Sequence, residues 1–287
     1  MSHPAGFEWN AELLGKHFPG GAAFLGSPSS NEGDGQRLAA SVGAKLDRMD
    51  QANIYPSLPT RYEGRLQALP FPFQAEKHAI VVDRSGKRFV SEHSFNIGEA
   101  LDRRDPLTRA PIHLPAWMVG DRRFLRRGAP FRWYARKCPN WLIKAGSIRD
   151  LATKLGLPQE ELVRTVDRFN RFCAAGKDDD FHRGESAWEK FKAGGPENSL
   201  GSIEEAPFLA APFSRSILGT KGGVRTNADG QALRPDGSVI AGLYAAGLAM
   251  ANPIGTRAVG PGTTIGPNLA WGFICAESLL KRAFAAR

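Results

Sequence analysis

The glycine-rich segment near the C-terminus has residue types and spacing that could do chemistry. Residues 260–266 read GPGTTIG, and an apolar run with helical spacing follows, from Thr263 or Thr264 to Leu280. Unpaired backbone N–H groups and the positive dipole end at a helix N-terminus attract negative charge. The segment is therefore a candidate anion site. Its spacing is GxGxxxG and not the dinucleotide GxGxxG, so glycines that serve only a tight turn and close helix packing remain an open alternative.

Other motifs in the sequence narrow the chemistry. The Gly33-Asp34-Gly35 segment lacks a third glycine and follows a Ser/Pro loop, so we assign it to the entry of a helix. No GxSxG, HExxH or GxxxxGK[ST] motif occurs, which argues against hydrolases and kinases. The three cysteines are far apart and odd in number, which favours a reducing compartment and no metal site.

The first and last of three sequence blocks contain these glycine motifs. In block 1–55, Leu38, Val42 and Leu46 are spaced four apart, which predicts a helix over 36–46. In block 211–287, two Asp-Gly turns predict an antiparallel meander, and the apolar strand 243–246 ends at Gly247.

The middle block, 56–210, combines strand and helix signals. Apolar residues 79–82, a turn at 83–86 and residues 88–90 predict a hairpin. A capping box at 147–150 predicts a helix that Gly156 stops. Pro158 begins a second helix, which ends at Gly176 and has one apolar stripe formed by Leu162, Val166, Phe169 and Cys173. This block is expected to be α+β.

Composition and charge limit the setting of the protein. The 287 residues are 42% hydrophobic and 23% charged, as in globular proteins. No apolar run is long enough for a transmembrane segment and the N-terminus does not resemble a signal peptide, so we expect a cytoplasmic protein. The net charge is +9, and arginines and aromatic residues mix over 122–137, but no nucleic-acid motif accompanies them. We expect no nucleic acid as partner, and a solvated face or attraction for an acidic substrate or cofactor instead.

Several longer segments together resemble one enzyme family. They are AGLYAAG, GTRAVGPGTTIGPNLAWG, GTKGGVRTNADGQAL and GKRFVSE. The chain from Gly6 onward resembles the FAD-dependent family of fumarate reductase and succinate dehydrogenase flavoproteins and 3-ketosteroid dehydrogenases, most closely the ketosteroid branch. The resemblance implies an α/β Rossmann-like FAD domain, formed by 1–55 and 211–287, with an inserted α+β substrate-binding cap domain at 56–210. The family's N-terminal GxGxxG has no counterpart, so the chain is similar to a flavin-domain fragment lacking its first βαβ unit.

The same resemblance implies a set of cofactor-binding positions. They are Ala246, Gly247, Gly262, Thr263, Thr264 and Ile265. In the family, the helix N-terminus faces the pyrimidine edge of the flavin, where negative charge develops on reduction. Leu248 departs from the Asn or Glu common in the family.

Three positions are implied for catalysis. Gly262 matches a glycine whose N–H, together with a tyrosine hydroxyl, holds the ketone oxygen, but the tyrosine position is Ala258. Arg257 matches a substrate-binding arginine of the fumarate branch, with a surface arginine as the alternative. Glu92 matches a proton-delivery glutamate, with an ion pair to Lys87 or Arg88 as the alternative.

The expected function follows from this family. It is FAD-dependent dehydrogenation or reduction of a carbon–carbon bond next to a carbonyl, with hydride transfer to flavin N5 and a steroid-like ketone as substrate. A small carboxylic acid is the alternative substrate, and the electron acceptor is unknown. Tyr55 and Tyr134 are both candidates for the proton acid or base. The alternative from another class is a truncated, non-catalytic fragment or binding module that needs a missing FAD-binding half.

Overall fold

The fold consists of two compact units. The computed structural model describes residues 6–22, 24–62, 64–70, 76–124, 141–260 and 262–285. Unit 1 comprises Met1–Ile54 and Ile217–Arg287, and unit 2 comprises Tyr55–Ser216. The chain leaves unit 1 within strand β3 (Ala52–Tyr55) and returns within β10 (Ser216–Thr220).

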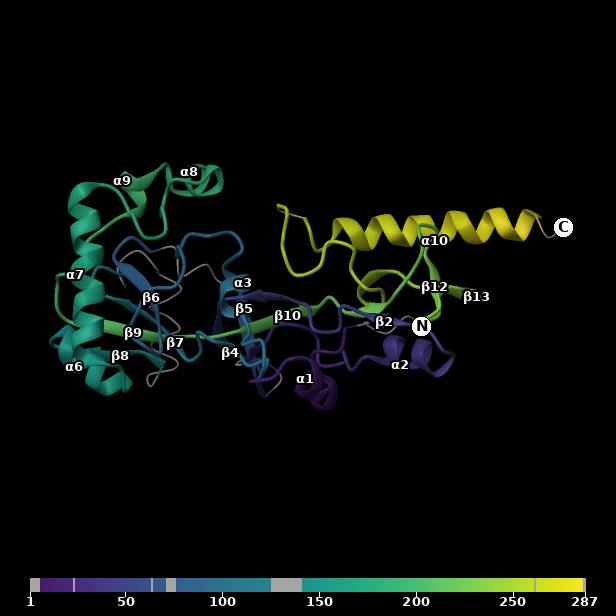
Figure 1. The fold of residues 1–287 in the computed structure, drawn as a ribbon, viewed down its shortest axis with the longest axis horizontal. Helices are drawn as coiled ribbons and strands as arrows, with labels where there is room; N and C mark the ends of the chain where they lie inside the picture. The colour runs from purple at the N-terminus through teal and green to yellow at the C-terminus, as the bar shows by residue number, and fades with distance from the viewer. Residues whose placement is uncertain are drawn as a thin grey trace. The chain divides into compact units, whose positions relative to one another are not determined.

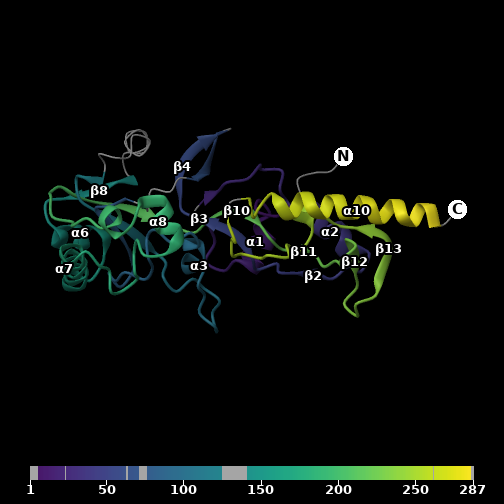
Figure 2. The same ribbon diagram turned by 90° about the horizontal axis from the view of Figure 1, so that it is seen from above.

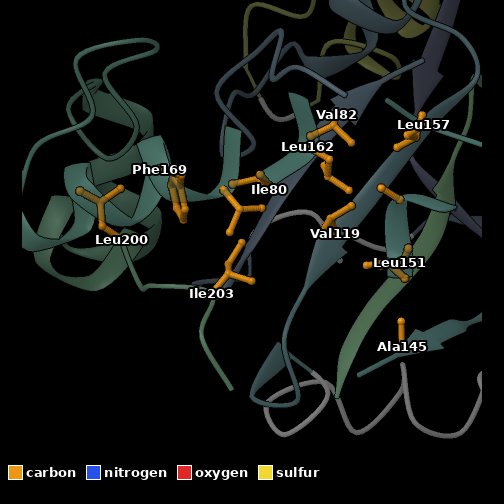
Figure 3. Packing of buried hydrophobic residues seen from close by; sticks show 13 residues of the cluster. Ile80, Val82, Val119, Ala145, Leu151, Leu157, Leu162, Phe169, Leu200 and Ile203 are labelled. Carbon is orange, nitrogen blue, oxygen red and sulfur yellow. The ribbon is translucent and has the colours of Figure 1, made fainter. Parts of the chain in front are cut away.

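Unit 2 is built on a four-stranded antiparallel sheet in the order β6-β7-β9-β8. Its strands are β6 (Ala79–Asp83), β7 (Ala116–Gly120), β8 (Ile143–Ala145) and β9 (Phe208–Phe213). Helices α6 (Ile148–Leu155) and α7 (Gln159–Ala175) pack against it (Figure 1). Figure 3 shows Leu162 of α7 among Ile80, Val82 and Val119 of the sheet, all four fully buried. This cluster is the core of the unit.

The helices of this core begin and end at the residues that the sequence indicates. The Ser147 hydroxyl accepts a hydrogen bond from the Asp150 amide at 3.0 Å, which caps α6. Gly156 and Gly176 follow α6 and α7 in the left-handed region, at φ +68° and +69°. Leu162, Val166 and Phe169 form the buried stripe of α7. Both predicted helices are confirmed.

The predicted hairpin at 79–90 is wrong in its second strand. The turn after Asp83 is present, but Arg88 meets Val82 only at an isolated bridge. The full ladder of β6 is with β7, with Val81 opposite Met118. The Arg88 side chain has a different role, described below. The other elements of unit 2 are β4 (Ser57–Tyr62), β5 (Arg65–Pro70), α3 (Ile97–Leu101), α8 (Ala187–Ala193) and α9 (Pro196–Ser199).

Unit 1 contains small sheets and one long helix. The sheets are β1-β10-β3, β11-β2 and β12-β13. The remaining elements are α1 (Ala11–His17), β1 (Phe24–Leu25), α2 (Asp34–Ser41), β2 (Leu46–Asp47), β11 (Gly223–Val224), β12 (Gln231–Leu233), β13 (Val239–Tyr244), the 3-10 helix η3 (Gly247–Ala249) and α10 (Gly266–Ala285). The α10 helix runs along β12 and β13 (Figure 1 and Figure 2), and Cys275 Sγ lies 3.6 Å from the Ala245 carbonyl oxygen. The predicted Asp236-Gly237 turn joins β12 to β13.

The helix predicted over 36–46 is shorter than expected and uses another face. It ends at Ser41, and Gly43 turns the chain at φ +85°. Leu38 and Val42 are exposed, whereas Gln36 and Ala39 are buried. The helix packs through that second face, so the predicted stripe is wrong.

The structure bears on two expectations drawn from composition, one about membrane-spanning helices and one about the arginine-rich stretch 122–137. Within the described ranges, no helix combines the length and hydropathy that crossing a bilayer requires. Of the arginine-rich stretch, residues 125–140, including Tyr134, lie outside the described residues. Arg122 and Arg123, at its start, form ion pairs with Glu205.

Candidate functional site

The first wall of the candidate site is the segment that follows β13. The Ala245 amide donates to the Gly230 carbonyl, and Ala246 is extended. Gly247 then turns into η3 at φ +66°, a conformation that favours glycine. The Gln36 Nε2 donates to the carbonyls of Leu248, at 3.0 Å, and Gly222, at 3.3 Å. A side chain of α2 therefore fixes η3 against the chain after β10.

The second wall is the turn that precedes α10. The Thr263 hydroxyl accepts from the amides of Val259 and Gly260, both at 3.1 Å, so it holds the turn together. The Gly262 carbonyl accepts from the amides of Ile265 and Gly266, and Gly262 itself lies at φ +87°. The α10 helix begins at Gly266, slightly later than the predicted Thr263 or Thr264.

The residues of this turn that follow Pro261 are largely exposed within unit 1. Gly262, Thr264 and Ile265 are exposed. Among the described residues, no hydrogen-bond acceptor pairs with the Gly262 amide. The first turn of α10 has no acidic residue, so nothing there offsets the positive dipole end. Because η3 contacts α10, the structure brings the predicted cofactor-binding positions into one region of unit 1.

A cavity of about 300 Å³ lies in the same unit. Its lining mixes apolar and cationic side chains and consists of Asp47, Arg48, Arg225, Thr226, Asn227, Ala228, Met250, Ala251, Pro253 and Trp271. The Arg225 guanidinium pairs with Asp47 at 2.8 Å. Burial raises the pKa of the Asp47 carboxyl, but the hydrogen bonds from the Arg48 amide and from Arg225 together outweigh burial and lower the pKa below its usual value. Arg48 donates to the Asn252 carbonyl at 2.5 Å.

The chemistry of these walls fits a flavin. Gln51 Oε1 and Trp271 Nε1 are buried and have no hydrogen-bond partner in the described part of the chain. One acceptor and one donor thus stay unsatisfied near the cavity, and such atoms are costly to bury alone. A flavin ring carries both carbonyl acceptors and an N–H donor. Arg257, on the loop between the two walls, is exposed.

Glu92 lies in unit 2, in a fully buried ion cluster. Arg88 donates to both of its carboxylate oxygens, at 2.9 and 2.8 Å, and Arg183 Nη1 lies 3.2 Å from Oε2. The Val81 amide donates to Oε1 at 3.0 Å. Although burial raises the pKa of this carboxyl, the two arginines outweigh it and hold the pKa at about 2. Arg88 also binds both carboxylate oxygens of Asp178.

These contacts favour the structural interpretation of Glu92, and its catalytic role stays a prediction. Of the two expected partners, Arg88 forms the ion pair, whereas Lys87 pairs with Glu161. His93 Nε2 accepts a hydrogen bond from Arg183 Nη2 at 3.0 Å, and burial, followed by the charge of Arg183, lowers the pKa of His93 to about 3.

Sequence reasoning missed two buried polar residues of unit 1. Glu8 is fully buried, and its Oε1 accepts from the Thr220 amide at 2.6 Å. Gln36 hydrogen-bonds to η3, as described above. Glu8 stands near the start of the described chain and Gln36 directly follows Gly33-Asp34-Gly35, but their partners are about two hundred residues away, so only the fold identifies them.

Comparison with known proteins identifies the family of the chain. The family model described as FAD binding domain matches residues 6–265. The 3-oxosteroid 1-dehydrogenase of Mycobacterium tuberculosis is 36% identical over 97% of this chain and 52% of its own length. The 4-oxocyclohexanecarboxylate 2-dehydrogenase of Sinomonas cyclohexanicum is 33% identical over 97% of this chain and 50% of its own.

A solved structure is also similar. It is the 3-ketosteroid delta1-dehydrogenase of Sterolibacterium denitrificans in complex with 1,4-androstadiene-3,17-dione, with a TM-score of 0.78, 26% identity and coverage of 95% of this chain and 51% of that one. The chain thus spans about half the length of the relatives it matches. The resemblance and the expectation of FAD as cofactor are confirmed, because the chain belongs to the FAD-binding-domain family that includes the 3-oxosteroid dehydrogenases.

Proposed function

We propose that this chain forms part of an FAD-dependent oxidoreductase that dehydrogenates a carbon–carbon bond next to the carbonyl of a bulky, steroid-like ketone. The similarity to a 3-oxosteroid 1-dehydrogenase along 97% of the chain carries this proposal. In this proposal unit 1 belongs to a Rossmann-like FAD domain, and unit 2 is the inserted cap that binds substrate.

The Gly262 amide is the group we assign to the ketone oxygen. It is exposed and donates to no described acceptor, so it is available as a donor. A hydrogen bond to the carbonyl oxygen stabilises negative charge there and makes the neighbouring C–H group easier to deprotonate. Bound FAD would supply the hydride acceptor, N5, for the adjacent carbon, and loss of the proton and the hydride would leave a carbon–carbon double bond. Thr263 and the α10 N-terminus hold this amide in place.

Arg257 is the residue we assign to substrate choice. One relative is named for a substrate with both a ketone and a carboxylate. An exposed arginine on the loop before Gly262 suits such a carboxylate, because a guanidinium binds it with two parallel hydrogen bonds.

Dye reduction tests both assignments. The protein is loaded with FAD and given a 3-oxosteroid or 4-oxocyclohexanecarboxylate, and reduction of an artificial electron acceptor is followed. We expect turnover of the steroid, and Arg257→Ala raises KM selectively for the carboxylate substrate. Lys281→Ala, which removes an exposed cation from α10, is the control. A protein that holds FAD but oxidises neither ketone contradicts the proposal.

A second candidate function, a module that binds a separate FAD-binding half, is favoured by the exposed face of α10. One face of the helix packs on unit 1 through Trp271, Cys275 and Ser278. Large apolar side chains on the opposite face are 58% to 71% exposed, and they are Ile265, Leu269, Phe273, Leu280 and Phe284. Soluble proteins rarely leave such a stripe uncovered. We propose that it binds the part of an FAD domain that carries GxGxxG.

Complementation tests this alternative. The portion of the Mycobacterium tuberculosis relative that this chain does not match is produced separately and mixed with the chain. We expect a complex on gel filtration that Leu269→Glu with Phe273→Glu abolishes and Lys281→Glu leaves intact. Self-association through the same face, or no complex at all, contradicts the module proposal but not the dehydrogenase proposal.

A further inference from the structure

Lys221, between β10 and β11, is a buried cation that no described residue neutralises. The residue is 3% exposed. Among the described residues, no carboxylate forms an ion pair with its ammonium and no acceptor hydrogen-bonds to it. Burial lowers the pKa of this amine, and no acidic neighbour opposes the effect. A largely buried charge is costly unless it is paired, so this site suits an anionic group from elsewhere.

The backbone around Lys221 places it beside the candidate site. Its carbonyl accepts from the Asn252 amide at 2.9 Å, and its own amide donates to the Gln51 carbonyl at 2.8 Å. Arg48 binds the carbonyl of the same Asn252. Asn252 lies between Ala251 and Pro253, which line the cavity. Arg48 therefore lines the cavity, and the backbone of Lys221 adjoins the same stretch of its wall, shortly after η3.

Close packing holds this arrangement. A Cβ atom at Gly222 would overlap the backbone of Arg48 and Met49, and one at Gly223 would overlap the Ala249 carbonyl. The two glycines let the segment after Lys221 approach its neighbours more closely than any other residue would. The position of Lys221 relative to η3 is thus fixed by backbone contacts.

We propose that Lys221 is a cofactor-binding residue whose ammonium contacts the N1–C2=O edge of the flavin ring. The inference rests on the proposed FAD-dependent function. Hydride addition at N5 leaves negative charge on that edge, and a desolvated ammonium stabilises it. The diphosphate of FAD is the competing anion. The flavin edge is favoured because Lys221 is bonded to the segment that follows η3, where the predicted flavin-contacting residues Ala246 and Gly247 lie.

The flavin-loaded protein tests this role through the affinity of the flavin for sulfite, which adds at N5 and places charge on the same edge. Lys221→Met keeps the length of the side chain and removes the charge. We expect sulfite to bind about tenfold more weakly, and the two-electron midpoint potential to fall by about 30 mV, the equivalent of about tenfold for such a couple. Lys281→Met, which removes an exposed lysine of the same unit, is expected to change neither value. Equal sulfite affinity in all three proteins overturns the proposal.

Amine labelling of the unsubstituted chain gives a test that does not depend on a variant folding. Acylation of each lysine is followed by mass spectrometry without ligand, with riboflavin, which has no phosphate, and with ADP, while flavin fluorescence reports binding. We expect riboflavin to slow acylation of Lys221 but not of Lys281, and ADP to protect neither. Protection by ADP alone assigns Lys221 to the diphosphate and overturns the proposal. Riboflavin that binds without protecting Lys221 overturns it too, and leaves the dehydrogenase function standing. A chain that binds no flavin contradicts both.

Discussion

The Glu92 carboxylate is bound on every side by donors from its own unit. Arg88, Arg183 and the Val81 amide all donate to it, and Arg88 carries on to Asp178. Glu92→Gln would leave two buried guanidinium groups short of a counter-charge. Breaking a buried ion pair from one side costs about 3–5 kcal/mol. We expect a loss of that size in the free energy of unfolding, measured with urea. Glu161→Gln, which breaks ion pairs with the exposed Lys87 and Arg164, should cost about 1 kcal/mol or less.

The same carboxylate makes the free energy of unfolding depend on pH in acid. Its pKa is about 2 in the folded protein and 4.5 when unperturbed. A carboxyl with a lowered folded pKa stabilises the fold at pH values above its unfolded pKa, and the stabilisation is lost as the pH falls toward the folded value. Urea titrations should therefore show stability falling between pH 4.5 and 2. Glu92→Gln should flatten this dependence. If the slope of stability against pH is unchanged in that variant, other carboxyls cause the loss of stability in acid.

Part of this cluster could be predicted from the sequence. Arg88 stands four residues before Glu92, and an ion pair between them was one expected alternative. Asp178 and Arg183 come from the segment after α7, some ninety residues away, and no local pattern relates them to Glu92. Long-range partners of this kind depend on how α7 docks on the sheet, which spacing alone does not determine.

Among the elements, the buried face of α7 was predictable and that of α2 was not, although a helix was predicted at each place. The signals for α6 and α7 are local, a serine cap and glycine stops, and α7 buries the same stripe that the sequence shows. The α2 helix also has an apolar stripe, but it packs through Gln36 and Ala39 because Gln36 hydrogen-bonds to Leu248 and Gly222. A polar residue with a distant partner thus overrides the hydrophobic pattern.

Truncating one leucine in each helix tests this difference. Leu162 of α7 is fully buried against the sheet, so Leu162→Ala should cost about 2–5 kcal/mol through lost burial and a cavity. Leu38 of α2 is 70% exposed, so Leu38→Ala should change the free energy of unfolding by no more than about 0.5 kcal/mol. Thermal and urea unfolding give both values. A large loss at Leu38 would indicate that something covers the α2 stripe in solution.

At the scale of the whole molecule, unit 1 joins the two ends of the sequence. Glu8 binds the Thr220 amide, Gln36 binds the Gly222 carbonyl, and β2 pairs with β11. The family resemblance implied that 1–55 and 211–287 form one domain. Spacing and periodicity within either block could not have shown this. All three contacts involve residues 220–224, so this short segment joins the N-terminal part of unit 1 to its C-terminal part.

That convergence predicts where unit 1 tolerates no added atom. A Cβ at Gly223 would overlap the backbone carbonyl of Ala249, and backbone cannot move aside as a flexible side chain can. Gly223→Ala should therefore destabilise unit 1 by about 1–3 kcal/mol or more, as overpacking does. Hydrogen exchange should show faster exchange of the β11 and β12 amides, while β6 and β7, in the separate core of unit 2, keep their protection. Gly15→Ala, in α1 with open space around it, should leave both patterns unchanged. Equal loosening of both units would mean that they unfold as one cooperative block.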